Sequence, residues 1–88
     1  MTIYIDDGYE RRVGEFWYHL ISDDVEDLHD FARDVGLKDE WFYYELPHVS
    51  NFPHYKIPED KRSLVIANGA VALERRDFLE KARAILHQ

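Results

Sequence analysis

Alternation of apolar and polar residues opens the chain and predicts a strand. Residues 2–6, Thr-Ile-Tyr-Ile-Asp, have the period of two that is typical of a half-buried strand, and Asp6-Asp7-Gly8 is a turn signal at its end. A charged loop through Arg11 and Arg12 is expected next. The aromatic-rich run from Phe16 to Ile21 then predicts a second strand, covered on both faces.

A helical period follows this second strand. Asp23 and Glu26 have capping-box spacing, and Gly36 is a stop signal, so we expect a helix between them. Its apolar positions repeat at helical intervals at Val25, Leu28, Ala32 and Val35.

The second half of the chain predicts further alternation of strands and helices. Residues 41–46 are strand-like, and strand, helix, strand within about thirty residues is typical of a parallel crossover unit. The stretch from Pro47 to Ile57 is expected to be an ordered loop, because it holds prolines and histidines. Pro58 is expected to open a helix that Gly69 ends, followed by a short strand at residues 71–73 and a final helix through Phe78.

These elements predict one small α/β domain over residues 1–88. Its short sheet is expected to be mixed or parallel and covered by about three helices, with a pocket near the carboxyl ends of the strands. With 45% apolar and 15% aromatic residues, the chain has enough to bury for a folded core.

Composition excludes several classes of function. The chain has no cysteine, which excludes disulfides, zinc-thiolate sites, iron–sulfur clusters and thiol catalysis. It also lacks a membrane-length apolar run, a His-Glu-x-x-His pair, a phosphate-binding glycine loop and a Gly-x-Ser-x-Gly elbow. We therefore expect a cytoplasmic protein without membrane contact, and the sequence specifies no cofactor.

The net charge of −7 is unevenly distributed. Residues 1–40 carry a net −8 and residues 41–88 a net +1. An acidic chain lacks the basic footprint that binds duplex nucleic acid, so extended nucleic-acid binding is not expected. A single phosphorylated small molecule or nucleotide remains compatible with the basic residues of the second half.

Candidate chemistry in the first half rests on one acid pair and two histidines. Asp6 and Asp7 lie at the carboxyl end of the first strand, where either carboxylate could bind a metal or act as a base, although the Asp-Gly dipeptide favours a simple turn. His19 lies inside an apolar strand, either as a satisfied core residue or as a proton-transfer group. His29 lies at the edge of the apolar stripe of the first helix and could meet His19 at the sheet. The spacing of these groups does not enforce a metal site.

A second group of candidates surrounds the predicted helix start at Pro58. Lys61 and Arg62 would lie near its first turn, where the helix dipole disfavours cations. A bound anion or the adjacent acids must therefore offset this unfavourable interaction. His54 and Tyr55 just upstream add donors. The pattern favours an anion site here.

Together these residues resemble a family of short bacterial and phage domains known as domain of unknown function 4031. The elements that carry the resemblance, in chain order, are Tyr4-Ile5-Asp6-Asp7, Tyr18 to Asp23, Glu26 to Ala32, Gly36-Leu37, Trp41, His54-Tyr55, Lys61-Arg62 and Gly69-Ala70-Val71. The resemblance implies that His19, His29, His54, Tyr55, Lys61 and Arg62 form one site, and it implies no activity.

Two positions depart from the family pattern. Members of the family often carry an acid directly after the His-Tyr pair, where this chain has Lys56, which weakens a metal site and favours an anion. The loop from Leu46 to Pro53 also differs in length, so His48 is interpreted as a loop residue.

Three functions follow as hypotheses. The first is a binding module for a phosphorylated small molecule or nucleotide, in which Lys61 and Arg62 hold phosphate and Trp17 or Trp41 stacks on a ring. The second is a metal-assisted phosphoester-cleaving enzyme with Asp6 and His19 as catalytic candidates. The third is a non-catalytic factor that binds a protein through its acidic face. A homodimer interface and a packed core account for the aromatic residues equally well.

Overall fold

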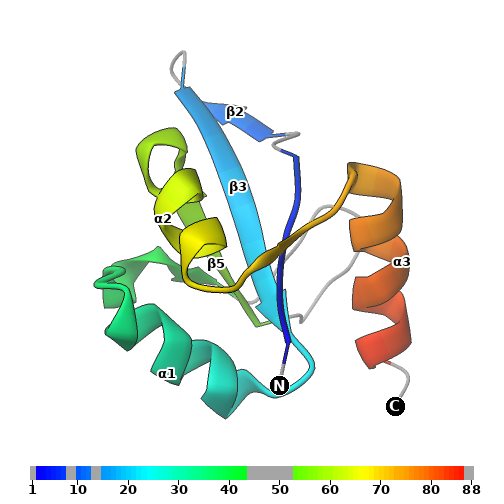
Figure 1. The fold of residues 1–88 in the computed structure, drawn as a ribbon. Helices are drawn as coiled ribbons and strands as arrows, with labels where there is room; N and C mark the ends of the chain where they lie inside the picture. The colour runs from blue at the N-terminus through cyan, green and yellow to red at the C-terminus, as the bar shows by residue number, and fades with distance from the viewer. Residues whose placement is uncertain (1, 8–9, 13–14, 44–52, 87–88) are drawn as a thin grey trace.

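The computed structural model describes residues 2–7, 10–12, 15–43 and 53–86. These residues form one mixed sheet with helices on both faces, which confirms the expected α/β class (Figure 1). The strands are β1 (Ile3–Ile5), β2 (Glu10–Arg12), β3 (Glu15–Ser22), β4 (Phe42–Tyr43), β5 (His54–Pro58) and β6 (Val71–Ala72). The helices are α1 (Val25–Asp34), α2 (Arg62–Ala67) and α3 (Arg75–Leu86), with 3-10 turns η1 (Asp39–Trp41) and η2 (Glu59–Lys61).

The long strand β3 lies at the centre of the sheet. The strand order is β4-β5-β3-β1-β6, and β2 also pairs with β3. The pair β1 and β6 is parallel, whereas β3 is antiparallel to β1, β2 and β5, and β4 is antiparallel to β5. Strands β3 and β4 therefore point the same way with β5 between them, instead of forming the adjacent parallel pair that a simple crossover predicts.

Strand alternation divides the core between the two faces of the sheet. One face packs against α1 and α2, and the other against α3, as Figure 1 shows. The core on the α1 and α2 face includes Ile3, Ile5, Tyr18, Leu20, Leu28, Phe31, Tyr55, Ile57 and Val65. The core on the α3 face is smaller and consists of Ile21, Phe78 and Ala82, with Tyr4, Leu73, Leu79 and Ile85 packed against it.

Helix α1 begins one residue later than the capping pattern predicts. The N-cap is Asp24 and not Asp23, because the Asp24 side chain accepts a hydrogen bond from the backbone N–H of Glu26 at 2.9 Å. The predicted stops after α1 and α2 are confirmed. Gly36 has φ of 79° and Gly69 has φ of 108°, a region that favours glycine.

The largest difference from the sequence prediction is strand β5. Residues 54–57 were expected in a loop, but they belong to a strand: Tyr55 to Pro58 pair with β3 on one side, and His54 and Tyr55 pair with β4 on the other. Pro58 ends this strand instead of opening a helix, and α2 begins at Arg62 after the turn η2. Proline is compatible with this position because the ladder ends there. Pro47 and His48 lie outside the described residues.

Three smaller predictions also change. The charged stretch at Arg11 and Arg12 forms β2 because it pairs with β3 in an antiparallel ribbon. Trp41 belongs to η1, and only Phe42 and Tyr43 of the expected strand over residues 41–46 are described as β4. No helix among the described residues is long and apolar enough to cross a bilayer.

The attachment of α3 to the sheet depends on Phe78, which is fully buried on the α3 face. Replacing Phe78 with alanine removes the largest buried side chain of that core. We predict that Phe78→Ala lowers the free energy of unfolding by about 3–5 kcal/mol, as measured by urea denaturation. The exposed Val71 is the matched control, and Val71→Ala should change stability by less than about 0.5 kcal/mol. Equal losses in the two variants would contradict this packing.

Candidate functional site

A buried carboxylate–imidazole pair lies at the centre of the sheet. Ile5 pairs with Leu20, so Asp6, the residue that follows β1, lies beside His19 of β3. The two side chains are fully buried, and Oδ2 of Asp6 lies 2.7 Å from Nδ1 of His19. Oδ1 of Asp6 accepts the backbone N–H of His19 at 2.9 Å, and the backbone N–H of Asp6 donates to the carbonyl of His19 at 3.2 Å. These bonds offset much of the cost of burying a charged group.

The pair also orients the imidazole. An ionised carboxylate can only accept hydrogen bonds, so Nδ1 of His19 carries the hydrogen in its contact with Asp6. In the neutral ring, this leaves Nε2 as the acceptor. Asp6 therefore acts as an orienting group for His19.

Two side chains of β5 share this face of the sheet. His19 is directly opposite Lys56 in the register, and His54 is two residues away along β5, on the same face. The rings of His19 and His54 have centroids 5.5 Å apart, and His54 is fully buried. We call Asp6, His19, His54 and Lys56 the α3-face cluster.

Helix α3 covers only part of this cluster. The ring of Phe78 lies edge-on to His19, with centroids 6.5 Å apart, and closes the buried end. On the side of β4, Lys56 is half-buried, with Nζ 4.9 Å from the ring centroid of Tyr43, a residue that is 41% exposed. The cluster thus runs from the buried histidines to the half-buried Lys56.

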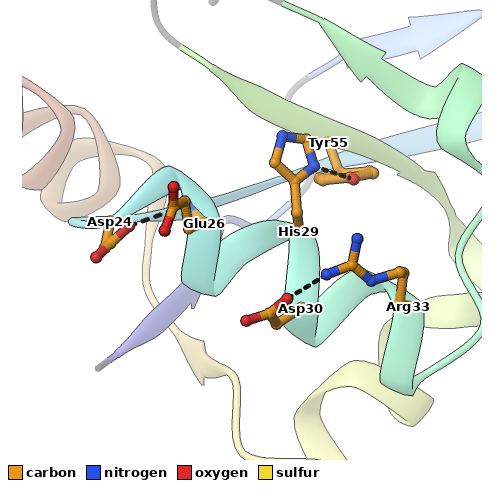
Figure 2. A network of polar contacts seen from close by, with 6 residues as sticks. All are labelled: Asp24, Glu26, His29, Asp30, Arg33 and Tyr55. Atoms are coloured by element: carbon orange, nitrogen blue, oxygen red, sulfur yellow. Dashed lines mark hydrogen bonds and ion pairs between the residues drawn. The ribbon is translucent and has the colours of Figure 1, made fainter.

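The opposite face carries a second polar contact, shown in Figure 2. Nδ1 of His29 in α1 and the hydroxyl of Tyr55 in β5 are 2.7 Å apart. Phe42 packs on both rings, at centroid distances of 4.6 Å from His29 and 5.2 Å from Tyr55. We call His29 and Tyr55 the α1-face pair.

An open hollow lies beside the α1-face pair. It has a volume of about 540 Å³ and is lined by Glu26, His29, Asp30 and Arg33. Arg33 forms an ion pair with Asp30 one turn away on the exposed side of α1, as Figure 2 shows. Two carboxylates and one guanidinium make the hollow acidic on balance, which does not suit an anion.

Burial raises the pKa of the Tyr55 hydroxyl above the usual value of 10.0. The nearby charge of Asp39 raises this pKa further, and the charge of Arg33 lowers it. The phenol therefore stays neutral at physiological pH and remains able to donate a hydrogen bond.

The residues that the sequence assigned to one site are divided between the two faces. His54 and Tyr55 are neighbours in a strand, so their side chains point to opposite faces. His29 consequently meets Tyr55, while His19 meets Asp6 and His54 on the other side. The expected contact between His29 and His19 across the sheet surface does not form.

The remaining predicted site residues lie on the α1 and α2 face. The guanidinium carbon of Arg62 is 5.1 Å from the ring centroid of Tyr18, which belongs to that core. Lys61 precedes it as the N-cap residue of α2, a helix of only six residues. Trp41 packs against the same core, with Nζ of Lys38 5.5 Å from its ring centroid.

Sequence reasoning omitted Lys56 and Tyr43 from the site. The missing signal was the alternation of His54, Tyr55, Lys56 and Ile57, which identifies the two faces once this stretch is recognised as a strand. No group of three or more histidine or acidic side chains among the described residues is arranged to hold a metal ion.

Comparison with known proteins places the chain in a family context. A family model described as protein of unknown function (DUF4031) matches residues 3–85, nearly the whole chain. No curated protein and no solved structure matches the chain.

The buried pair should make a large contribution to stability. Asp6→Ala leaves His19 without the carboxylate that contacts its ring and its backbone, so we predict a loss of about 3–5 kcal/mol in the free energy of unfolding. Asp7 is the matched control because it is adjacent and exposed. Asp7→Ala should change the free energy by less than about 0.5 kcal/mol in the same urea titration. A small effect of Asp6→Ala would show that the pair does not anchor the sheet.

The raised pKa of Tyr55 predicts a stability loss in alkali. Its folded-state pKa lies above its unfolded value, so its contribution is complete below pH 10 and is lost as the pH rises through the folded-state pKa. Urea midpoints measured from about pH 8 to 11 should fall in the wild type and fall less steeply in Tyr55→Phe. The exposed Tyr43 provides the control, and Tyr43→Phe should retain the wild-type slope. Identical slopes for wild type and Tyr55→Phe would rule out this effect.

Proposed function

The chain belongs to the DUF4031 family, and we propose that it binds a phosphorylated small molecule or nucleotide at the α3-face cluster. The observation that carries this proposal is the alignment of Lys56 with His19 and His54 on one face of the sheet. The family description names no activity, so the proposal rests on the chemistry of these side chains.

The donors of the cluster suit a phosphate group. Lys56 supplies an ammonium, and the imidazole of His54 can donate from a ring nitrogen, whereas the Nδ1 hydrogen of His19 is already engaged by Asp6. Charge-assisted hydrogen bonds to phosphate are among the stronger polar contacts in proteins, and partial burial strengthens them. The negative charge of Asp6 is engaged by His19 through two contacts, which limits its repulsion of an anion.

This site differs from the phosphate site that the sequence suggested. Arg62 lies over Tyr18 on the opposite face, so it cannot join His54 in one pocket. Lys56 takes the role of the phosphate-binding cation in the proposal because it lies in the same row as His19.

The metal-assisted enzyme has less support than the binding module. Each oxygen of the Asp6 carboxylate contacts His19, and the ammonium of Lys56 on the same face opposes the binding of a divalent cation. Carboxylate oxygens that are free to bind are the ligands that such cations require. The donor set therefore fits an anion better than a metal.

The proposal predicts that Lys56 dominates phosphate affinity. Isothermal titration calorimetry with adenosine 5′-monophosphate should show binding to the wild type and an affinity at least about tenfold lower for Lys56→Gln, because a charged hydrogen bond is lost. Affinity should also fall with added salt.

Lys38 offers the matched control for this titration. It is an exposed lysine that lies over Trp41, away from the α3 face, so Lys38→Gln should bind like the wild type. Equal losses in the two variants would indicate a non-specific charge effect. Absence of binding to the wild type would overturn the proposal.

A further inference from the structure

The two tryptophans of the chain have different surroundings. Trp41 packs against the core on the α1 and α2 face and is covered by the ammonium of Lys38. Trp17 is half-buried in the central strand β3, and neither core cluster of the described residues includes it. An indole of this size that is left partly open on a sheet face has surface available for stacking.

Trp17 lies on the same face as the α3-face cluster. It is two residues before His19 in β3, and strand alternation places both side chains on one side of the sheet. Its partners in the register are Glu10 of β2 on one side and, on the other, Pro58, two residues after Lys56 in β5. One such step spans about 7 Å along a strand. We call each such cross-strand pair a row. The row of Trp17 and Pro58 is thus the next one on this face after the row of His19 and Lys56.

We propose that Trp17 stacks on a nucleobase and that the ligand of the α3-face cluster is a nucleoside monophosphate. This inference rests on the proposed function, since Lys56 must hold the phosphate. A ribose links the base to its 5′-phosphate, and the two rows are separated by a distance that one sugar can span. The apolar ring of Pro58 belongs to the residue paired with Trp17 and borders the same stacking position.

The chemistry of the site specifies the class of ligand in two ways. A single ammonium in the row of His19 matches one phosphate group better than a polyphosphate, which carries more negative charge. An indole face attracts a flat aromatic base, whereas a sugar phosphate without a base makes no equivalent contact. Base stacking on an aromatic side chain typically changes affinity by about tenfold or more.

The test compares adenosine 5′-monophosphate with ribose 5-phosphate. In a Trp41→Phe variant Trp17 is the sole tryptophan, and its fluorescence should be quenched by adenosine 5′-monophosphate but not by ribose 5-phosphate. In calorimetry the nucleotide should bind about tenfold more tightly than the sugar phosphate. Trp17→Leu should reduce nucleotide affinity to the level of ribose 5-phosphate and leave the latter unchanged.

The outcomes separate this inference from the proposed function. Equal binding of the two compounds, with unchanged Trp17 fluorescence, would overturn nucleobase stacking and leave the phosphate site intact. Binding of neither compound would overturn both. Circular dichroism checks the fold of Trp17→Leu. If that variant does not fold, Trp17→Phe replaces it and should still bind the nucleotide more tightly than the sugar phosphate, because a phenyl ring also stacks on a base. The comparison of the two ligands on the wild type then tests the inference.

Discussion

The contact between Asp6 and His19 is the constraint on which the rest of the structure depends. A carboxylate and an imidazole that are fully buried in a small sheet need hydrogen-bond partners, and here each contacts the other. The same carboxylate also accepts the backbone N–H of His19, so the polar pair and the register of β1 on β3 are fixed together. The side chains around it must then keep water out, which is the role of Phe78 in α3.

Strand β5 places polar side chains on both faces of the sheet. Its alternating side chains send His54 and Lys56 to the α3 face and Tyr55 to the α1 face. On the α1 face, the contact of Tyr55 with His29 joins helix α1 to the sheet beside an acidic hollow. On the α3 face, His54 and Lys56 join Asp6 and His19 in the cluster where we propose that an anion binds. The sheet therefore lies between the α1-face pair and the α3-face cluster, whose histidines the sequence analysis assigned to a single site.

Strong local patterns predicted most of the fold. The alternation in β1, the apolar run in β3, the helical period of α1 and the glycine after α2 all describe what the structure contains. Strands β2 and β5 could not be predicted, because β2 is short and charged, prolines bound β5, and both form through pairing with β3. The candidate site, like the fold, was predicted only where local patterns were strong. Asp6, His19, His54 and Trp17 were recognised by type, but Lys56 joins them only once residues 54–58 are known to be a strand.

Binding of an anionic ligand on the α3 face of the sheet can be tested by a nuclear magnetic resonance titration of the histidine ring signals with adenosine 5′-monophosphate. We expect the signals of His19 and His54 to shift together and saturate, while the signal of His29 stays in place, because the sheet lies between them. A shift of His29 alone, or no saturable shift of His19 and His54, would contradict it.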